Sequence, residues 1–153
     1  MTHLKVGDVA PNFTGKNQDG KEIGSKDFAG KKIILYFYPK DMTPGCTAQA
    51  CNLTENYAAL LEKGYAVVGV SPDSESKHKK FIEKYNIPFD LIADEDLSVI
   101  KSFGVWGEKQ MYGRKYEGVY RETFIIDEQG KNRRGYHESS NKRPLSSNNR
   151  MTY

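Results

Sequence analysis

The chain has 153 residues and two cysteines, enough for one domain of ordinary size. Its 23 basic and 20 acidic residues give a formal charge of +3, but the charges are unevenly placed. From Asn132 to the end there are five basic residues and one acidic residue, which leaves 18 basic and 19 acidic residues before it. The body is therefore nearly neutral, which argues against a nucleic-acid-binding domain, because such domains carry clustered basic stripes.

A membrane protein is also disfavoured. The longest apolar run, Ile33–Tyr38, is far shorter than the roughly 20 residues that cross a bilayer. The N-terminus lacks the apolar stretch of a signal peptide, so we expect a cytoplasmic protein. Two cysteines do not make a disulfide scaffold, and in a reducing compartment such a pair is reactive, metal-binding or buried.

Short β-type runs alternate with helical patterns along the chain, which is typical of an α/β fold. The first 32 residues are polar, and the turn signal Asp19-Gly20 predicts a hairpin before the main sheet. Ile33–Tyr38 is apolar throughout and is typical of a buried central strand. A helix is expected to begin after Thr43 and to end near Gly64.

The second half continues this alternation up to a turn. Strands are predicted over Ala66–Val70, Phe89–Ala93 and Val119–Asp127, and helices after Asp73 or Ser74 and over Leu97–Phe103. The intervening Gly104–Gly118 has the composition of a loop.

The apolar pattern stops after a turn at Glu128–Lys131. The residues that follow are rich in Ser, Asn and Arg, which is typical of a disordered tail. We therefore expect one domain over residues 1–131 and a polar basic tail, disordered or aberrant, over 132–153. A basic arm for an anionic partner is the alternative interpretation of the tail.

Cys46 is the main candidate for chemistry. If Thr43 caps the helix and Pro44 is its first residue, Cys46 is the third, in the first turn. Unpaired N–H groups and the helix dipole favour an anion there, so we expect a thiolate. The alternative, a small buried apolar residue, is disfavoured by this position.

Cys51 lies five residues further on, about 140° around the helix and about 7.5 Å along it. Disulfide geometry requires closer and converging residues, so the two sulfurs cannot bond while the helix is intact. The spacing excludes a CxxC redox pair, and two thiols without a nearby His make a poor zinc site. An inert buried thiol remains an alternative for Cys51.

These motifs resemble the peroxiredoxin family, most closely its Q-type or bacterioferritin comigratory protein branch. The resemblance rests on Pro39, Thr43 and Cys46 in a P-x-x-x-T-x-x-C pattern, on GCTAQAC, on FGVWGEK at 103–109, and on YRETFIID with Arg121. It implies a thioredoxin-like fold with a central mixed β-sheet flanked by helices. An N-terminal hairpin extension and an atypical polar C-terminal tail would complete the chain.

The resemblance also implies roles for single residues. Cys46 would be the peroxidatic cysteine, whose thiolate attacks the peroxide and becomes a sulfenic acid. Thr43 would offer its hydroxyl to the thiolate or the peroxide, and Pro39 would shield the pocket from water. Arg121, expected on the core face of a strand, would stabilise the thiolate and the leaving oxygen. A surface arginine is the alternative.

Cys51 would be the resolving cysteine, which forms an intramolecular disulfide with Cys46 during each cycle. The implied substrates are hydrogen peroxide and small alkyl hydroperoxides, and the implied reductant is thioredoxin or a similar dithiol. No metal or organic cofactor enters this scheme, and the relatives are commonly monomeric.

The end of the chain departs from the family, whose members continue with an apolar strand and a covering helix. Residues 132–153 offer neither, so we hypothesise an altered reading frame or a truncated variant. Two other functions follow from this departure. One is a redox-responsive binding or holdase protein with an uncovered apolar surface, and the other is an intact site on an unstable body.

Overall fold

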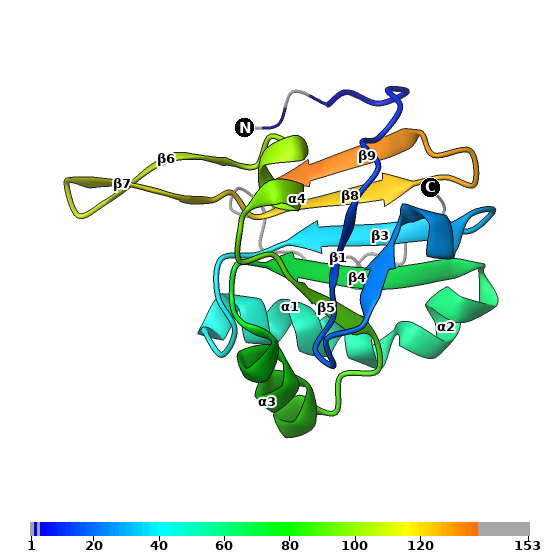
Figure 1. Cartoon of the computed structure of the whole chain (residues 1–153), viewed down its shortest axis with the longest axis horizontal. Coiled ribbons are helices and arrows are strands. Elements are labelled where there is room, and N and C mark those ends of the chain that lie inside the picture. Colours follow the sequence, from blue (N-terminus) through cyan, green and yellow to red (C-terminus); the bar gives the residue numbers. More distant parts are fainter. Residues whose placement is uncertain (1, 3, 138–153) are drawn as a thin grey trace.

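The computed structural model of the protein describes Thr2 and residues 4–137. Its centre is a mixed seven-stranded sheet in the order β2-β1-β5-β4-β3-β8-β9 (Figure 1). The strands of this sheet are β1 (Thr14–Lys16), β2 (Glu22–Gly24), β3 (Lys32–Phe37), β4 (Tyr65–Ser71), β5 (Asp90–Ala93), β8 (Glu122–Ile126) and β9 (Asn132–His137). β3 is parallel to β4 and antiparallel to β8.

Helices cover both faces of this sheet. They are η1, a 3-10 helix (Ser25–Phe28), α1 (Pro44–Glu55), α2 (Tyr57–Glu62), α3 (Glu75–Tyr85) and α4 (Ser98–Ser102). The alternation of β3 separates two cores. Ile34 and Tyr36 face α1, α2 and α3, whereas Leu35 and Phe37 face α4 and the N-terminal segment. The predicted α/β architecture is confirmed.

The N-terminal hairpin is also confirmed. β1 and β2 pair antiparallel and are joined through the predicted Asp19-Gly20 turn, where Gly20 has φ +78°. The side chain of Asn17 fixes this turn, since its Oδ1 accepts hydrogen bonds from the backbone N–H groups of Asp19 and Lys21. Among the described residues, no helix is long and apolar enough to cross a membrane.

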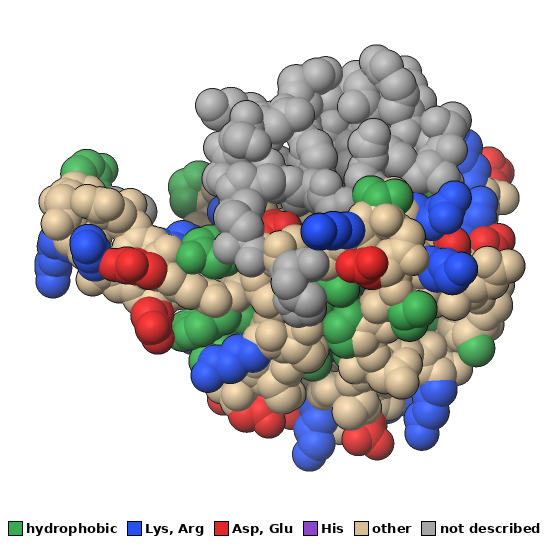
Figure 2. Space-filling view, turned by 90° about the horizontal axis from the view of Figure 1, so that it is seen from above, with side chains coloured by type: hydrophobic (Ala, Val, Ile, Leu, Met, Phe, Trp, Pro, Cys, Tyr) green, Lys and Arg blue, Asp and Glu red, His purple; other side chains and the backbone are tan. Residues whose placement is uncertain are grey.

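The expected loop at Gly104–Gly118 is wrong, because most of it forms a hairpin of β6 (Trp106–Met111) and β7 (Arg114–Val119). Its turn residues, Tyr112 and Gly113, both have positive φ (54° and 77°), as a tight hairpin turn requires. The hairpin stands out from the body (Figures 1 and 2), so neither face needed the apolar alternation that marks a strand in a sequence.

Three boundaries differ from those expected. The first helix breaks at Asn56 into α1 and α2. The strand expected from Val119 begins only at Glu122, because Val119 still belongs to β7. The strand β9 occupies residues 132–137, where we expected the polar tail to begin. An end strand needs only backbone pairing with β8, so polar residues can form it. The rest of the predicted tail, 138–153, lies outside the described residues.

Candidate active site

Cys46 occupies the position that the sequence predicts, as the third residue of α1. Its side chain is only 2% exposed, and its thiol is free. Thr43 precedes the helix in an extended conformation, and its carbonyl accepts the first helical hydrogen bond from the N–H of Thr47 at 2.8 Å. The N–H groups of the first turn have no partner within a helix, so their dipoles favour an anion at the sulfur.

Thr43 is at the N-cap position, but its side chain does not cap the helix. The hydroxyl instead donates to the backbone carbonyl of Lys40 at 2.9 Å and so ties the loop before α1 together. Its oxygen still has lone pairs for another donor. Pro39 lies half-buried at the start of the same loop, directly after β3. The proposed roles of both residues in the reaction remain predictions.

Arg121 lies against the first turn of α1. It lies in the short connection before β8, not within a strand as expected. Its guanidinium packs on Gly45, where a Cβ would be 3.2 Å from Nη2 and 3.8 Å from Nη1. Nη1 is buried and has no hydrogen-bond partner within the described part of the chain. A half-buried arginine with one buried, free donor therefore lies against Gly45, the residue before Cys46, which suits an incoming anion.

Lys109 is a second cation at this end of α1, and the sequence analysis did not single it out. It lies on β6, and its ammonium group donates to the carbonyl of Val119 at 2.9 Å. Burial and the charge of Arg121 lower the pKa of Lys109, and the charge of Cys46 opposes them. The only signal in the sequence was its place at the end of FGVWGEK.

Cys51 lies further along α1, is half-buried and has a free thiol. Tyr36 of β3 lies near both cysteines. Burial is the main reason that the pKa of Tyr36 is well above the usual value, followed by the charges of Cys46, Asp41 and Cys51. The charges of both cysteines therefore contribute to the raised pKa of the same buried hydroxyl. Five residues of intact helix separate them, so a disulfide would require α1 to unwind.

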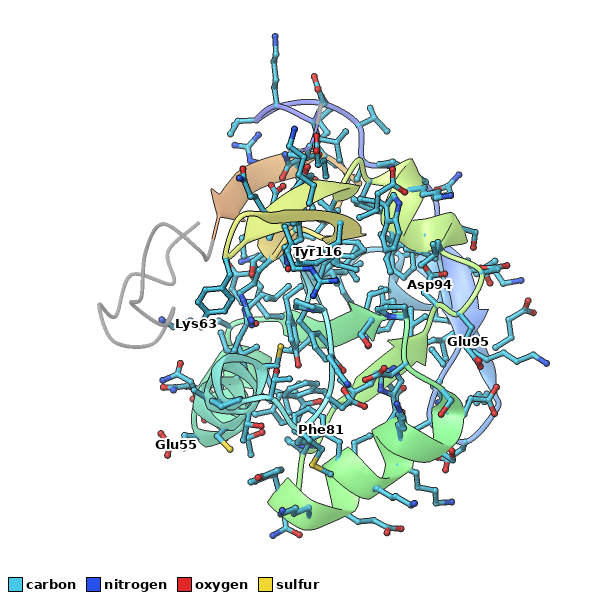
Figure 3. All side chains as sticks on the ribbon, turned by 90° about the vertical axis from the view of Figure 1, so that its left-hand side faces the viewer. Glu55, Lys63, Phe81, Asp94, Glu95 and Tyr116 are labelled. Atoms are coloured by element: carbon cyan, nitrogen blue, oxygen red, sulfur yellow. The ribbon has the colours of Figure 1, made fainter. Side chains whose placement is uncertain are left out.

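Figure 3 looks from the side on which the β6–β7 hairpin projects. In this view Tyr116 lies on the β6–β7 hairpin above α1, and the buried Phe81 of α3 points inward below it. The site is thus bordered by α1, the end of β3 and the base of the hairpin. Within the described part of the chain, no group of three or more His, Cys, Asp or Glu side chains could hold a metal ion.

Comparison with known proteins identifies the family. Residues 6–134 match the AhpC/TSA family. The chain is 47% identical to peroxiredoxin Bcp of Escherichia coli over 131 residues, which cover 86% of this chain and 84% of the relative. It is 43% identical to peroxiredoxin Bcp of Bacillus subtilis over 128 residues, which cover 84% of this chain and 82% of that relative.

Solved structures show the same fold. Peroxiredoxin Q of Xanthomonas campestris superimposes with a TM-score of 0.79 at 29% identity, covering 90% of this chain and 87% of that chain. BcpB of Mycobacterium tuberculosis gives a TM-score of 0.78 at 31% identity, covering 89% and 88%. The thioredoxin-like fold expected from the motifs is thereby confirmed.

Proposed function

Because the chain belongs to the AhpC/TSA family and is a peroxiredoxin, we propose that it reduces hydrogen peroxide and small alkyl hydroperoxides through Cys46. The observation that carries this proposal is the pairing of a buried first-turn thiol with a half-buried arginine whose Nη1 atom is buried. Arg121 presents an Nη1 group that has no hydrogen-bond partner in the described part of the chain. A peroxide oxygen in the site would supply the missing acceptor.

The first step is a displacement at oxygen. The Cys46 thiolate attacks one peroxide oxygen, a sulfur–oxygen bond forms, and the O–O bond breaks. The sulfur loses two electrons, and the second oxygen leaves as hydroxide or alkoxide and takes up a proton to become water or an alcohol. Arg121 stabilises the charge that develops on the leaving oxygen, because its guanidinium already lies against the first turn of α1 and its Nη1 is buried. Cys46 becomes a sulfenic acid.

In the second step, the Cys51 thiol attacks the sulfur of the Cys46 sulfenic acid. A disulfide forms and water leaves. The protein as a whole neither gains nor loses electrons in this step. The first turns of α1 unwind for this step, since an intact helix keeps the two residues too far apart. Thioredoxin or a similar dithiol then reduces the disulfide by thiol exchange and becomes oxidised itself. We propose that this cycle runs in a cytoplasmic monomer.

The test is consumption of hydrogen peroxide by the full chain with thioredoxin, thioredoxin reductase and NADPH. Turnover should depend on Cys46, so Cys46→Ser should abolish it. Cys51→Ser should permit one equivalent of peroxide to react and then stop or slow. Turnover by Cys46→Ser would contradict the proposal. No turnover by the wild-type chain, with peroxide-dependent exposure of apolar surface, would instead support the redox-responsive binding protein.

A further inference from the structure

The loop between β3 and α1 is held in an unfavourable shape. Met42, which is neither glycine nor asparagine, has φ +68°, in the left-handed region that costs other residues roughly 1–2 kcal/mol. Its side chain is 43% exposed, so packing of that side chain does not hold the conformation. The neighbouring Asp41, in contrast, is only 4% exposed. The loop must therefore be fixed through Asp41.

Asp41 is bound from three sides. Its Oδ1 accepts a hydrogen bond from the Tyr38 hydroxyl at 2.6 Å. Its Oδ2 lies 2.6 Å from Nδ1 of His78, which is on α3 and fully buried. Its backbone N–H donates to Oδ2 of Asp73 at 2.7 Å. The loop is thus attached to the end of β3, to α3 and to the connection that precedes α3.

The second nitrogen of His78 fixes the position of one proton and the number of protons in the pair. Nε2 lies 2.9 Å from the backbone carbonyl of Ile92, which can only accept, so Nε2 carries a hydrogen. Nδ1 then faces the Asp41 carboxyl at 2.6 Å, where two bare lone pairs would repel. One proton must lie in this contact, on Nδ1 or on Oδ2. Either way the buried pair has no net charge, which makes its burial tolerable.

The other titratable groups around the pair come from three elements. Burial, and then the charges of Tyr36 and Asp41, raise the pKa of Tyr38 well above its usual value, so this hydroxyl stays a donor. Cys46 of α1 also acts on Tyr38. Asp73 has its own cation, Lys77, at 4.0 Å. Tyr38 thus donates to the Asp41 carboxyl, whereas Asp73 accepts from the Asp41 backbone N–H.

We propose that Asp41 and His78 are positioning residues that hold the loop carrying Thr43 in register with Cys46 and Arg121. The inference rests on the proposed function and deepens it. Its physical basis is that the Asp41 carboxyl is held by Tyr38, directly after β3, and by His78 of α3. Neither β3 nor α3 has to move when α1 unwinds. Asp41 therefore marks the N-terminal limit of the unwinding, two residues before Thr43, and gives α1 a fixed start from which to refold.

The test measures two rate constants for Cys46 in the reduced full chain, one with hydrogen peroxide and one with iodoacetamide. The iodoacetamide rate constant depends on how reactive and how accessible the Cys46 thiolate is. The peroxide rate constant depends in addition on the position of the loop that carries Thr43. In Asp41→Ala the ratio of the peroxide constant to the iodoacetamide constant should fall about 10- to 100-fold, the usual cost of a small misplacement. In Asp41→Asn it should recover to within about threefold, because the amide can donate to neutral His78 and accept from Tyr38.

Val99→Ala is the matched control, since Val99 is buried on α4 against the opposite face of the sheet. It should lose stability by a comparable amount and keep the wild-type ratio. If Asp41→Ala does not fold, Tyr38→Phe removes one of the three attachments and should lower the ratio by about two- to fivefold. If Asp41→Ala, or Tyr38→Phe in its place, folds and keeps the wild-type ratio, the inference is wrong. A wild-type chain that does not react with peroxide would overturn the proposed function as well.

Discussion

The guanidinium of Arg121 lies directly on Gly45, the residue before Cys46. A Cβ at position 45 would meet Nη2 at 3.2 Å, which is tighter than ordinary van der Waals contact, and Cζ at 3.6 Å, which is an ordinary contact. The glycine therefore lets the cation reach the first turn of α1. Activity and stability should respond in opposite directions when this space is filled.

Gly45→Ala should leave the fold intact and stabilise it by roughly 0.5–1 kcal/mol, because alanine is the better helix residue. The peroxide rate constant should nevertheless fall about tenfold, since the methyl group displaces Arg121. Urea unfolding and stopped-flow oxidation of the same samples measure the two effects. Ala48→Ser, on the exposed side of α1, is the control. An unchanged rate constant in Gly45→Ala would separate Arg121 from the chemistry.

Lys109→Met should slow the oxidation of Cys46 by peroxide by roughly two- to fivefold, because it removes a positive charge that interacts with the charge of Cys46. Stopped-flow oxidation of the reduced variant measures this rate constant. Lys115→Met removes an exposed cation from the same hairpin and should leave the rate constant unchanged.

The alkaline limit of activity should depend on Lys109 too. Burial lowers its pKa, so its charge is lost at a lower pH than that of an ordinary lysine. The contribution of this charge to the rate is present below that pKa and disappears as the pH rises through it. Lys109→Arg keeps its charge, so the fall should move to higher pH. A profile that is identical in wild type and Lys109→Arg would remove Lys109 from the site.

Glu122→Gln should stabilise the protein at neutral pH. Burial raises the pKa of Glu122, although the N–H of Thr2 donates to its carboxylate and partly offsets this. The folded state thus binds the proton more tightly, and stability is lost as the pH rises from 4.5 through the raised pKa. Glutamine has no carboxyl group to ionise, so the variant avoids this loss of stability, which is on the order of 1 kcal/mol. Urea midpoints at pH 4 and pH 7 measure it, and exposed Glu128→Gln is the control.

Peroxide should open α1 but not α2. After one equivalent of peroxide, amide exchange should become fast in the turns from Pro44 to Cys51, because the disulfide cannot form on an intact helix. Amides of α2 should keep their protection, since the break at Asn56 separates the two helices. Cys51→Ser should show no opening after the same treatment. Full protection of α1 in a disulfide-bonded sample would refute the unwinding step.

Much of the fold could be predicted because its strongest signals are local. The apolar run at Ile33–Tyr38 became β3 and its flank, and Pro44 marked the start of α1. The position of Cys46 in the first turn followed from these two boundaries. The hairpin β6–β7 could not be predicted in this way, because it projects from the body and buries little apolar surface. Its Tyr112-Gly113 turn also lacks the usual Asn-Gly or Asp-Gly signal.

The residues that complete the site were harder to find, for a different reason. Arg121 was identified from a motif, but its connection to Gly45 depends on strand pairing between distant segments. Lys109 reaches the site only because the unpredicted hairpin places it there. The bond between Asp41 and His78 likewise joins a loop to a helix that follows a later strand. Local periodicity carries no information about such pairs.

The antiparallel pairing of β3 with β8 has a consequence for synthesis of the chain. Phe37, near the end of β3, is in register with Glu122, at the start of β8. Cys46 follows one strand and Arg121 precedes the other, so this single pairing assembles both halves of the site. On the ribosome, Cys46 emerges long before the strand that brings its arginine. The nascent chain therefore carries a cysteine without its guanidinium partner, and peroxidase activity can appear only after residues 122–126 have left the exit tunnel.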